Sequence, residues 1–264
     1  MGIKLNVGVI GGGNMGAAII SGIHKDNKVF VCEADLARQK YLKKKFNVSI
    51  LALKDLLAQS NYIILATKPQ DFETLLNEIK PYSKKNHVFV SIAAGITTQY
   101  IEKRLHPGAR VIRTMPNLPA QVQQGVTAIS AGRSASKTDL INVQKLFNTI
   151  GTTFIRDEKY IDSITAVSGS GPAYVYMFIE CMNNAAVILG LDQKLSKEIV
   201  LQTIKGAVNL LEQQNEDAAT LRKKVTSKGG TTQAALTVFE KADIQQIFNK
   251  ALKSAKQRAK ELSR

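Results

Sequence analysis

The sequence predicts an α/β fold, in which a mostly parallel, doubly wound sheet is followed by an all-helical region. Up to about residue 155, short runs rich in β-branched residues alternate with segments that carry apolar residues at helical spacing. The chain opens with an apolar strand, a glycine-rich loop and a helix, in "NVGVIGGGNMGAAII". Beyond Ile155 the strand pattern stops. Continuous apolar strands separated by helices are typical of a parallel sheet that is covered on both faces.

The expected elements follow in chain order. We expect strands at 6–11, 29–33, 49–51, 62–67, 87–92, 110–115, 126–130 and 152–155. Helices between these strands are expected at 14–24, 36–45, 71–79, 97–105 and 137–149. The helical region is expected to hold helices at 160–166, 171–189, 193–213, 217–225, 230–241 and 243–262. The chain is therefore expected to form a first domain at 1–157 and a second at 158–264, whose wide apolar faces predict oligomerisation.

The composition is that of an ordinary globular protein, with 44% hydrophobic and 22% charged residues. A formal net charge of +15 raises the question of a nucleic-acid partner. The basic residues are scattered over most of the expected helices, however, and no aromatic residues interleave with them. We therefore expect no nucleic-acid partner. The charge is either a basic background shared with the rest of the proteome or a means of attracting anionic small molecules.

Neither a membrane nor an exported location is expected. The longest apolar run, 171–190, contains Glu180, Asn183 and Asn184, so it predicts a helix buried at an interface rather than a membrane span. The N-terminus shows no export signal, so we expect the cytoplasm. Cys32 and Cys181 lie in apolar contexts without metal-ligand spacing, which indicates small core residues and no metal site.

The first glycine-rich loop has the spacing of a dinucleotide-binding loop. Gly11, Gly13 and Gly16 form G-x-G-x-x-G, with Asn14 and Met15 inside the motif, between a strand and a helix. In a Rossmann-like unit the first glycine makes the turn, the second admits the pyrophosphate and the third lets the helix pack closely. The glycine spacing alone is weak evidence, but the position of the motif between a strand and a helix predicts a nicotinamide dinucleotide site.

The end of the second strand bears on the choice of cofactor. Glu33 follows Gly11 by twenty-two residues, where a carboxylate would accept hydrogen bonds from the adenine ribose. A carboxylate there repels a 2′-phosphate and favours NAD(H), whereas Arg38 or a nearby lysine could serve NADP(H). A solvated charge at a helix start is nearly as good an interpretation of Glu33.

Two further strand ends are expected at the same edge, because ligands of open α/β sheets bind outside the carboxyl ends of the strands. Their small residues and forced turns would let the nicotinamide come close to the backbone. They are Ala66, Thr67, Lys68 and Pro69 in "LATKPQ", and Ala93, Ala94 and Gly95 in "SIAAGIT".

A second glycine-rich loop stands near the other end of the chain, in "KKVTSKGGTTQAAL" at 223–236. It lies at the expected start of an Ala/Leu-rich helix, where backbone N–H groups can hold an anion. The three histidines, His24, His87 and His106, lie at the ends of expected helices or strands, so we expect them on the surface. No proton donor stands out among them.

Six motifs, in their order and spacing, resemble those of the pyrroline-5-carboxylate reductases, which catalyse the last step of proline synthesis. The resemblance covers essentially the whole chain, and "SGSGPAY" and "GGTT" are more specific to that family than the dinucleotide loop. The motifs are "GVIGGGNMG", "ATKPQ", "SIAAGIT", "RTMPNLPAQVQQG", "AVSGSGPAYVYMFIE" and "VTSKGGTTQAAL".

The resemblance implies hydride transfer from NAD(P)H to the C5 of a cyclic imine, with NADP(H) the more usual cofactor, in a homodimer that assembles into a larger homo-oligomer. It assigns the small cyclic imine carboxylate to the second loop, and Thr232 to a hydrogen bond with the ring nitrogen as the catalytic residue. Glu158 matches a position that can contact substrate. The substrate-binding residues are then Glu158, Ser227, Gly229, Gly230, Thr231 and Thr232.

The sequence departs from the family at two positions. Lys228 stands where the family usually has proline, which fixes φ and stiffens a loop, and Leu118 stands where many members have threonine. We expect activity to survive and substrate affinity to be affected. Two other functions stay open: a reductase of a related cyclic imine or other small carboxylate, and a non-catalytic nucleotide- or nucleic-acid-binding protein.

Overall fold

The computed structural model describes residues 4–263, and the chain divides into two compact units. The first unit comprises Met1–Pro172 together with Ala255–Arg264, and the second comprises Ala173–Ser254.

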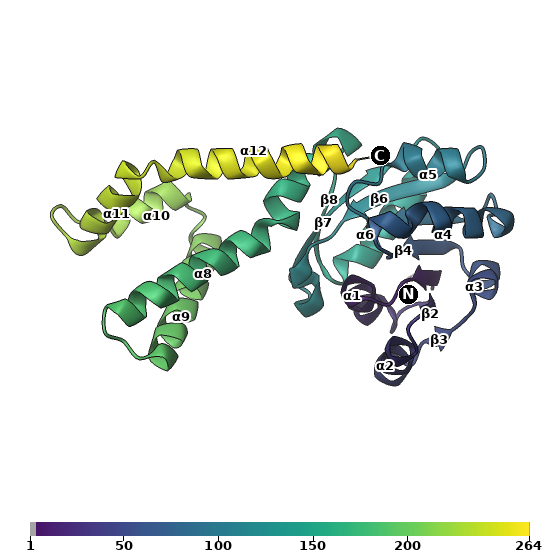
Figure 1. Cartoon of the computed structure of the whole chain (residues 1–264), viewed down its shortest axis with the longest axis horizontal. Coiled ribbons are helices and arrows are strands. Elements are labelled where there is room, and N and C mark those ends of the chain that lie inside the picture. The colour runs from purple at the N-terminus through teal and green to yellow at the C-terminus, as the bar shows by residue number, and fades with distance from the viewer. Residues whose placement is uncertain (1–3, 264) are drawn as a thin grey trace. The chain divides into compact units, whose positions relative to one another are not determined.

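The first unit is built on one eight-stranded sheet (Figure 1). Its strands are β1 (Asn6–Ile10), β2 (Lys28–Cys32), β3 (Ser49–Ile50), β4 (Tyr62–Leu65), β5 (Val88–Ser91), β6 (Arg110–Met115), β7 (Gly125–Ala131) and β8 (Gly151–Ile155). They lie in the order β3-β2-β1-β4-β5-β6-β7-β8, and only the β6–β7 pair is antiparallel. The expected Rossmann-like, mostly parallel sheet is confirmed, with a strand at each of the eight expected places.

The two faces of the sheet carry separate apolar cores. On β1, Val7 and Val9 pack with α1 (Asn14–Ile23), α2 (Leu36–Phe46) and α6 (Lys137–Asn148). Ile10 points to the other face and packs with α3 (Leu53–Gln59), α4 (Phe72–Ile79) and α5 (Thr98–Arg104). This alternation places a helical layer on each side and leaves the carboxyl edge of the parallel strands to the loops.

The sequence interpretation missed α3. Its seven residues follow Ala52, an N-cap residue whose side chain cannot accept a hydrogen bond, so no capping signal marks the start of the helix. The expected helix at 160–166 is also more complex. α7 (Ile161–Ile164) runs into a π-helical turn, Thr165–Gly169, before α8 (Gly171–Ile188) begins. π-Helical turns occur frequently at functional sites.

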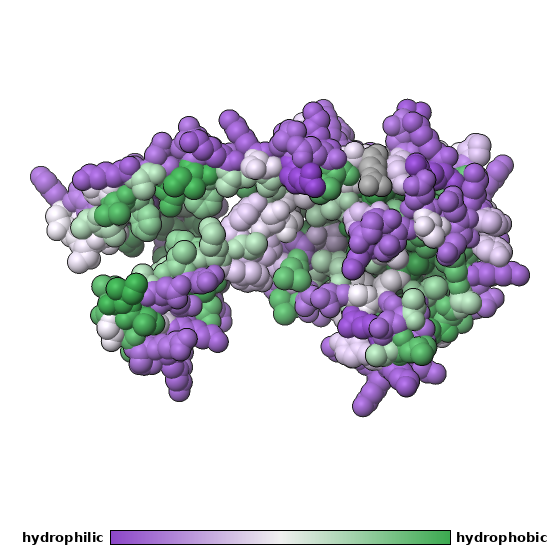
Figure 2. Space-filling view, viewed as in Figure 1, coloured by the Kyte–Doolittle hydropathy of each residue, from purple (hydrophilic) through white to green (hydrophobic). Residues whose placement is uncertain are grey.

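The second unit contains helices alone: α8 from Ala173 onward, α9 (Gln193–Gln214), α10 (Ala218–Lys224), α11 (Thr231–Lys241) and the part of α12 (Ile244–Leu262) up to Ser254. Within the described chain, Ser196 and Val200 are its only buried side chains. Large apolar side chains are exposed instead, including Ile188 and Leu189 at 85% and 84%. Figure 2 shows hydrophobic residues on the surface of these helices. A single chain therefore leaves much of the apolar surface of these helices uncovered.

Three expectations about individual residues need correction or comment. Cys181 is exposed on α8, so it is not the core residue that was expected, whereas Cys32 is partly buried and packs against the apolar core of the sheet. His87 is not on the surface: it is 1% exposed, since its ring packs edge-on against Phe89 and its Nδ1 accepts from the Lys84 N–H. Among the helices of residues 4–263, none combines the length and apolarity that crossing a membrane would take.

Candidate functional site

In the loop after β1, two glycines stand where any larger side chain would clash with neighbouring backbone atoms. Gly11 has φ +99°, and a Cβ there would lie 2.6 Å from the carbonyl oxygen of Ala66. Gly16 packs so closely on Gly11 that a Cβ would overlap the Gly11 carbonyl oxygen. Gly13 has open space where its Cβ would stand. The first and third glycines are therefore needed for packing, and the second leaves the backbone open to a ligand.

The helices α1 and α11 both begin after a glycine, which has no side chain to cap the helix. The N-cap residues are Gly13 and Gly230, both extended, and within residues 4–263 neither helix has a side-chain cap. The first-turn N–H groups of a helix have no partner inside the helix. Side chains satisfy some of these groups in α2, α5, α6, α9 and α10, through Asp35, Thr97, Ser136, Asp192 and Asp217. The two glycine-rich loops thus present open amide groups suited to anions.

Two charged side chains hydrogen-bond to the backbone N–H and C=O groups of Gly12 in the first loop. The Glu33 carboxylate accepts from the Gly12 N–H at 2.5 Å and from the Asp35 N–H at 2.8 Å. Arg38 donates to the Gly12 carbonyl through Nε at 3.0 Å and Nη2 at 2.6 Å. Each carboxylate oxygen can accept a second hydrogen bond, so these contacts do not prevent Glu33 from binding ribose hydroxyls. That role of Glu33 stays a prediction.

The thiol beside this loop stays protonated. Burial, helped by the negative charges of Glu33 and Glu78, raises the pKa of Cys32. A thiol held in its neutral form is a poor nucleophile.

The next two strand ends lie beside the first loop, because β1, β4 and β5 are neighbours in the sheet. At the end of β4, the Thr67 hydroxyl is buried and has no hydrogen-bond partner within residues 4–263. Lys68 is exposed, and Pro69 begins the 3₁₀ turn Pro69–Asp71. After β5, Ala93 is buried and Ala94 leads to Gly95, whose φ is +75°. The predicted cofactor residues therefore share one edge, with a buried hydroxyl still free to bind a ligand.

Asn117 also lies near this edge, beyond the end of β6, and sequence reasoning did not single it out. Its Nδ2 donates to the Ser168 carbonyl in the π-helical turn at 3.0 Å, and its Oδ1 accepts from the Val126 N–H at 2.8 Å. Gly169 in the same turn packs against Met115, since a Cβ there would lie 2.9 Å from the Met115 Cε. Asn117 thus anchors the "SGSG" segment, and its place just after a strand end was the available signal.

The second loop differs in detail from the expected arrangement of amides. Gly229 has φ +73°, and its N–H donates to the Gln233 side-chain carbonyl at 2.6 Å. The Gly230 N–H donates to the Ser227 carbonyl at 3.1 Å, within a turn. The groups left for a carboxylate are therefore those of the first turn of α11, beginning with Thr231 and the half-buried Thr232. Gln233 is a residue of this loop that the sequence reasoning did not name.

Glu158 lies in the first unit, where its carboxylate contacts Thr98 and Arg113. The expectation that it contacts substrate stays a prediction, since every contact of its carboxylate within the described chain is with the protein itself.

Comparison with known proteins identifies the family. The chain is 36% identical over 94% of its length to pyrroline-5-carboxylate reductase 2 of Bacillus subtilis, covering 94% of that protein. It belongs to the pyrroline-5-carboxylate reductase family. The family model "Pyrroline-5-carboxylate reductase dimerisation" matches residues 158–262, and "NADP oxidoreductase coenzyme F420-dependent" matches residues 6–95.

Solved structures of the family have the same fold. A pyrroline-5-carboxylate reductase from Coxiella burnetii has a TM-score of 0.92 at 32% identity, covering 99% of this chain and all of that one. A Plasmodium falciparum pyrroline carboxylate reductase with NADP bound has a TM-score of 0.89 at 31% identity, with both chains fully covered.

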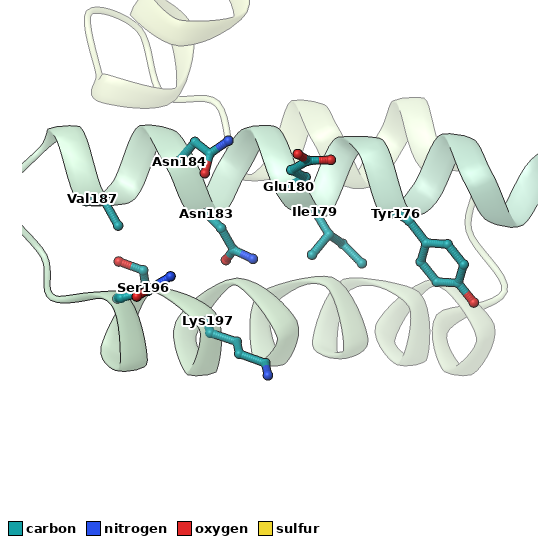
Figure 3. Close-up of a pocket in the computed structure, with 9 residues that line it drawn as sticks. Tyr176, Ile179, Glu180, Asn183, Asn184, Val187, Ser196 and Lys197 are labelled. Atoms are coloured by element: carbon teal, nitrogen blue, oxygen red, sulfur yellow. The ribbon is translucent and has the colours of Figure 1, made fainter.

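A cavity in the second unit holds none of the predicted site residues of this reductase. It has a volume of about 310 Å³ and lies between α8 and α9 (Figure 3). Ile179, Asn183 and Val187 of α8 point toward α9 in that view, and the Asn183 Oδ1 is buried without a hydrogen-bond partner in the described chain. The helix pair is incompletely packed here, in line with the exposed apolar surface of this unit.

Proposed function

We propose that the protein is an NAD(P)H-dependent pyrroline-5-carboxylate reductase, which transfers a hydride to the C5 of 1-pyrroline-5-carboxylate and gives L-proline. The observation that carries the proposal is the pair of glycine-capped helices, α1 and α11, whose open N-termini suit two different anions. The first suits a dinucleotide pyrophosphate and the second a substrate carboxylate. Family membership supports this division of roles.

The comparisons support NADP(H) as the cofactor. NADP is bound in the Plasmodium falciparum relative, and it appears in the description of the family model over residues 6–95. The reduced nicotinamide supplies the hydride when it is bound. We propose that Gly11, Gly13, Asn14, Met15 and Gly16 hold the pyrophosphate. The strand ends Ala66–Pro69 and Ala93–Gly95 would exclude water and orient the ring, with the Thr67 hydroxyl as a hydrogen-bonding group. NAD(H) stays a second cofactor, because Glu33 is suited to an unmodified ribose.

The substrate residues are proposed to act by placement. The first-turn amides of α11 would hold the carboxylate, with Ser227, Gly229 and Gly230 shaping the loop, and the Thr232 hydroxyl would orient the ring nitrogen. An imine that arrives protonated, or takes its proton from water, needs no acid from the chain. Catalysis then rests on orientation, electrostatic placement and exclusion of solvent.

We further propose that residues 1–157 form the dinucleotide-binding domain and residues 158–264 the substrate-binding and dimerisation domain. Dimerisation is supported by the family model over 158–262 and by the exposed apolar side chains of the helical unit. The dimer would assemble further into a larger homo-oligomer, without nucleic acid or membrane as partners. The cytoplasm is the proposed compartment, in keeping with two free cysteines.

The test is steady-state kinetics with the five-membered imine, run in parallel with NADPH and NADH. We expect imine-dependent loss of nicotinamide absorbance. Thr232→Ala is expected to lower kcat/KM for the imine about tenfold or more, the loss of one hydrogen bond to a charged group, while cofactor affinity is unchanged. Cofactor binding without turnover of the imine would contradict the proposal. Turnover of a six-membered imine alone would indicate a related imine reductase.

A further inference from the structure

We propose that Glu158, held in place by Arg113, is a positioning residue for the loop at 93–97. This inference rests on the proposed function, since it takes that loop to form part of the cofactor site. It gives Glu158 a role different from the direct substrate contact that the family resemblance implies.

The anchor of the arrangement is a buried guanidinium. Arg113 stands on β6 and its side chain is 3% exposed. Its Nη1 lies 3.2 Å from the Glu158 Oε1, and its Nη2 lies 3.6 Å from the Asp162 Oδ1. A buried charge is stable only when it is paired, so these two carboxylates are held where the guanidinium needs them.

Both oxygens of Glu158 are engaged at the start of α5. Oε1 accepts from the Thr98 N–H at 2.9 Å, and Oε2 accepts from the Thr98 hydroxyl at 2.7 Å. Thr97 caps the same helix by accepting from the Tyr100 N–H at 3.1 Å. Two side chains, one of them sixty residues away in sequence, therefore fix the point where the loop enters the helix.

The other side of the loop is held by the last turn of α12. A Cβ on Gly95 would overlap the Leu262 carbonyl oxygen, so the two backbones are in close contact. The hydroxyl of the next residue, Ser263, lies 3.4 Å from the Asp162 Oδ1 and 3.1 Å from the Ala259 carbonyl, and Asp162 is the second partner of Arg113. The loop at 93–97 thus lies between two contacts that meet at the same guanidinium.

This arrangement fixes a loop that should lie against the nicotinamide. Small shifts of groups that position a reacting ring are costly, because orientation must be kept within a fraction of an ångström. Weakening the Glu158 contacts should therefore raise the Kd for the cofactor more than it raises the KM for the imine.

The test compares Glu158→Gln with Glu102→Gln in the full-length protein. Glu102 lies on α5, the helix that Glu158 contacts through Thr98. The Glu102 carboxylate also accepts from a backbone N–H, that of Arg133 at 2.8 Å, so it is a matched control. The Kd for NADPH and for NADH is measured by titrating the fluorescence of the reduced cofactor, without imine. Thermal unfolding and the KM for the imine are measured alongside.

We expect Glu158→Gln to raise the Kd for the reduced cofactor about tenfold, with the KM for the imine at saturating cofactor changed less than twofold. Glu158→Asp, which keeps the charge for Arg113, should recover part of the affinity, and Glu102→Gln should leave it unchanged. A rise in the KM for the imine alone would overturn the proposal in favour of direct substrate contact. An unchanged Kd with a lower melting temperature would leave Glu158 a structural role only, and overturn it as well.

The readout separates this proposal from the proposed function. A protein that binds cofactor but does not reduce the imine would contradict the reductase activity while the Kd comparison still decides the role of Glu158. A wild-type protein that binds neither NADPH nor NADH would overturn both.

Discussion

Replacing Gly95 with alanine should destabilise the first unit for two separable reasons. With φ at +75°, a non-glycine residue costs about 1–2 kcal/mol in backbone strain. The new Cβ would also overlap the Leu262 backbone, and forcing extra atoms into a packed site costs about 1–3 kcal/mol more. The expected loss in the free energy of unfolding is therefore about 2–5 kcal/mol, the sum of these two estimates.

Gly108 provides a matched control for the strain alone. Its φ is +80°, and nothing lies within 4 Å of where its Cβ would stand, so Gly108→Ala should cost only about 1–2 kcal/mol. Urea unfolding of both variants gives the steric contribution as the difference. Removing residues 262–264 from the Gly95→Ala variant should recover that difference relative to the same truncation of the wild type. Equal losses for Gly95→Ala and Gly108→Ala, with no recovery on truncation, would refute the contact between the loop and the last turn of α12.

Three further predictions concern pH, the substrate loop and the cofactor loop. Burial lowers the pKa of His87 below 6.5, so the unfolded chain takes up a proton first as pH falls; the free energy of unfolding should decrease below about pH 6.5, and His87→Gln should flatten that slope in equilibrium unfolding. Gly229→Ala has open space for its Cβ at φ +73°, so it should cost only about 1–2 kcal/mol in unfolding while raising the KM for the imine; an unchanged KM would remove the loop from the substrate site. Arg38→Ala frees the Gly12 carbonyl and should raise the Kd for NADH and NADPH alike by about tenfold, whereas a loss confined to NADPH in the same fluorescence titration would indicate contact with the 2′-phosphate instead.

Most of the fold could be predicted because its signals are local. The central strands β1, β4, β5 and β6 are short runs of consecutive buried residues, and such a run is the sequence pattern of a strand covered on both faces. The features that were missed lack such signals. α3 follows Ala52, whose side chain cannot cap a helix, and the π-helical turn at Thr165–Gly169 depends on a shift in hydrogen-bond partner. The antiparallel direction of β7 did have a signal, because the connection from β6 is too short for a crossover helix.

The candidate site could be predicted as far as its motifs reached. The glycine spacing located both loops, because backbone conformation and close approach require glycine itself. Which N–H groups of the second loop stay free could not be predicted. The Gly229 N–H donates to the side chain of Gln233, which has many other possible partners. His87 was placed on the surface for a similar reason: position at a strand end does not tell which neighbours will cover the ring.

The contacts around Arg113 show where reasoning along the chain runs out. Glu158 and Thr98 are sixty positions apart, and Asp162 and Ser263 are 101 positions apart, so no spacing rule connects them. Only the fold brings these groups to one buried guanidinium. The same folding places the Gly95 backbone against Leu262, which gives the glycine in "SIAAGIT" a reason beyond room for a nicotinamide. The glycine of this motif is thus required by packing whether or not a ligand is bound, and the paired variants at Gly95 and Gly108 measure that packing requirement apart from backbone strain.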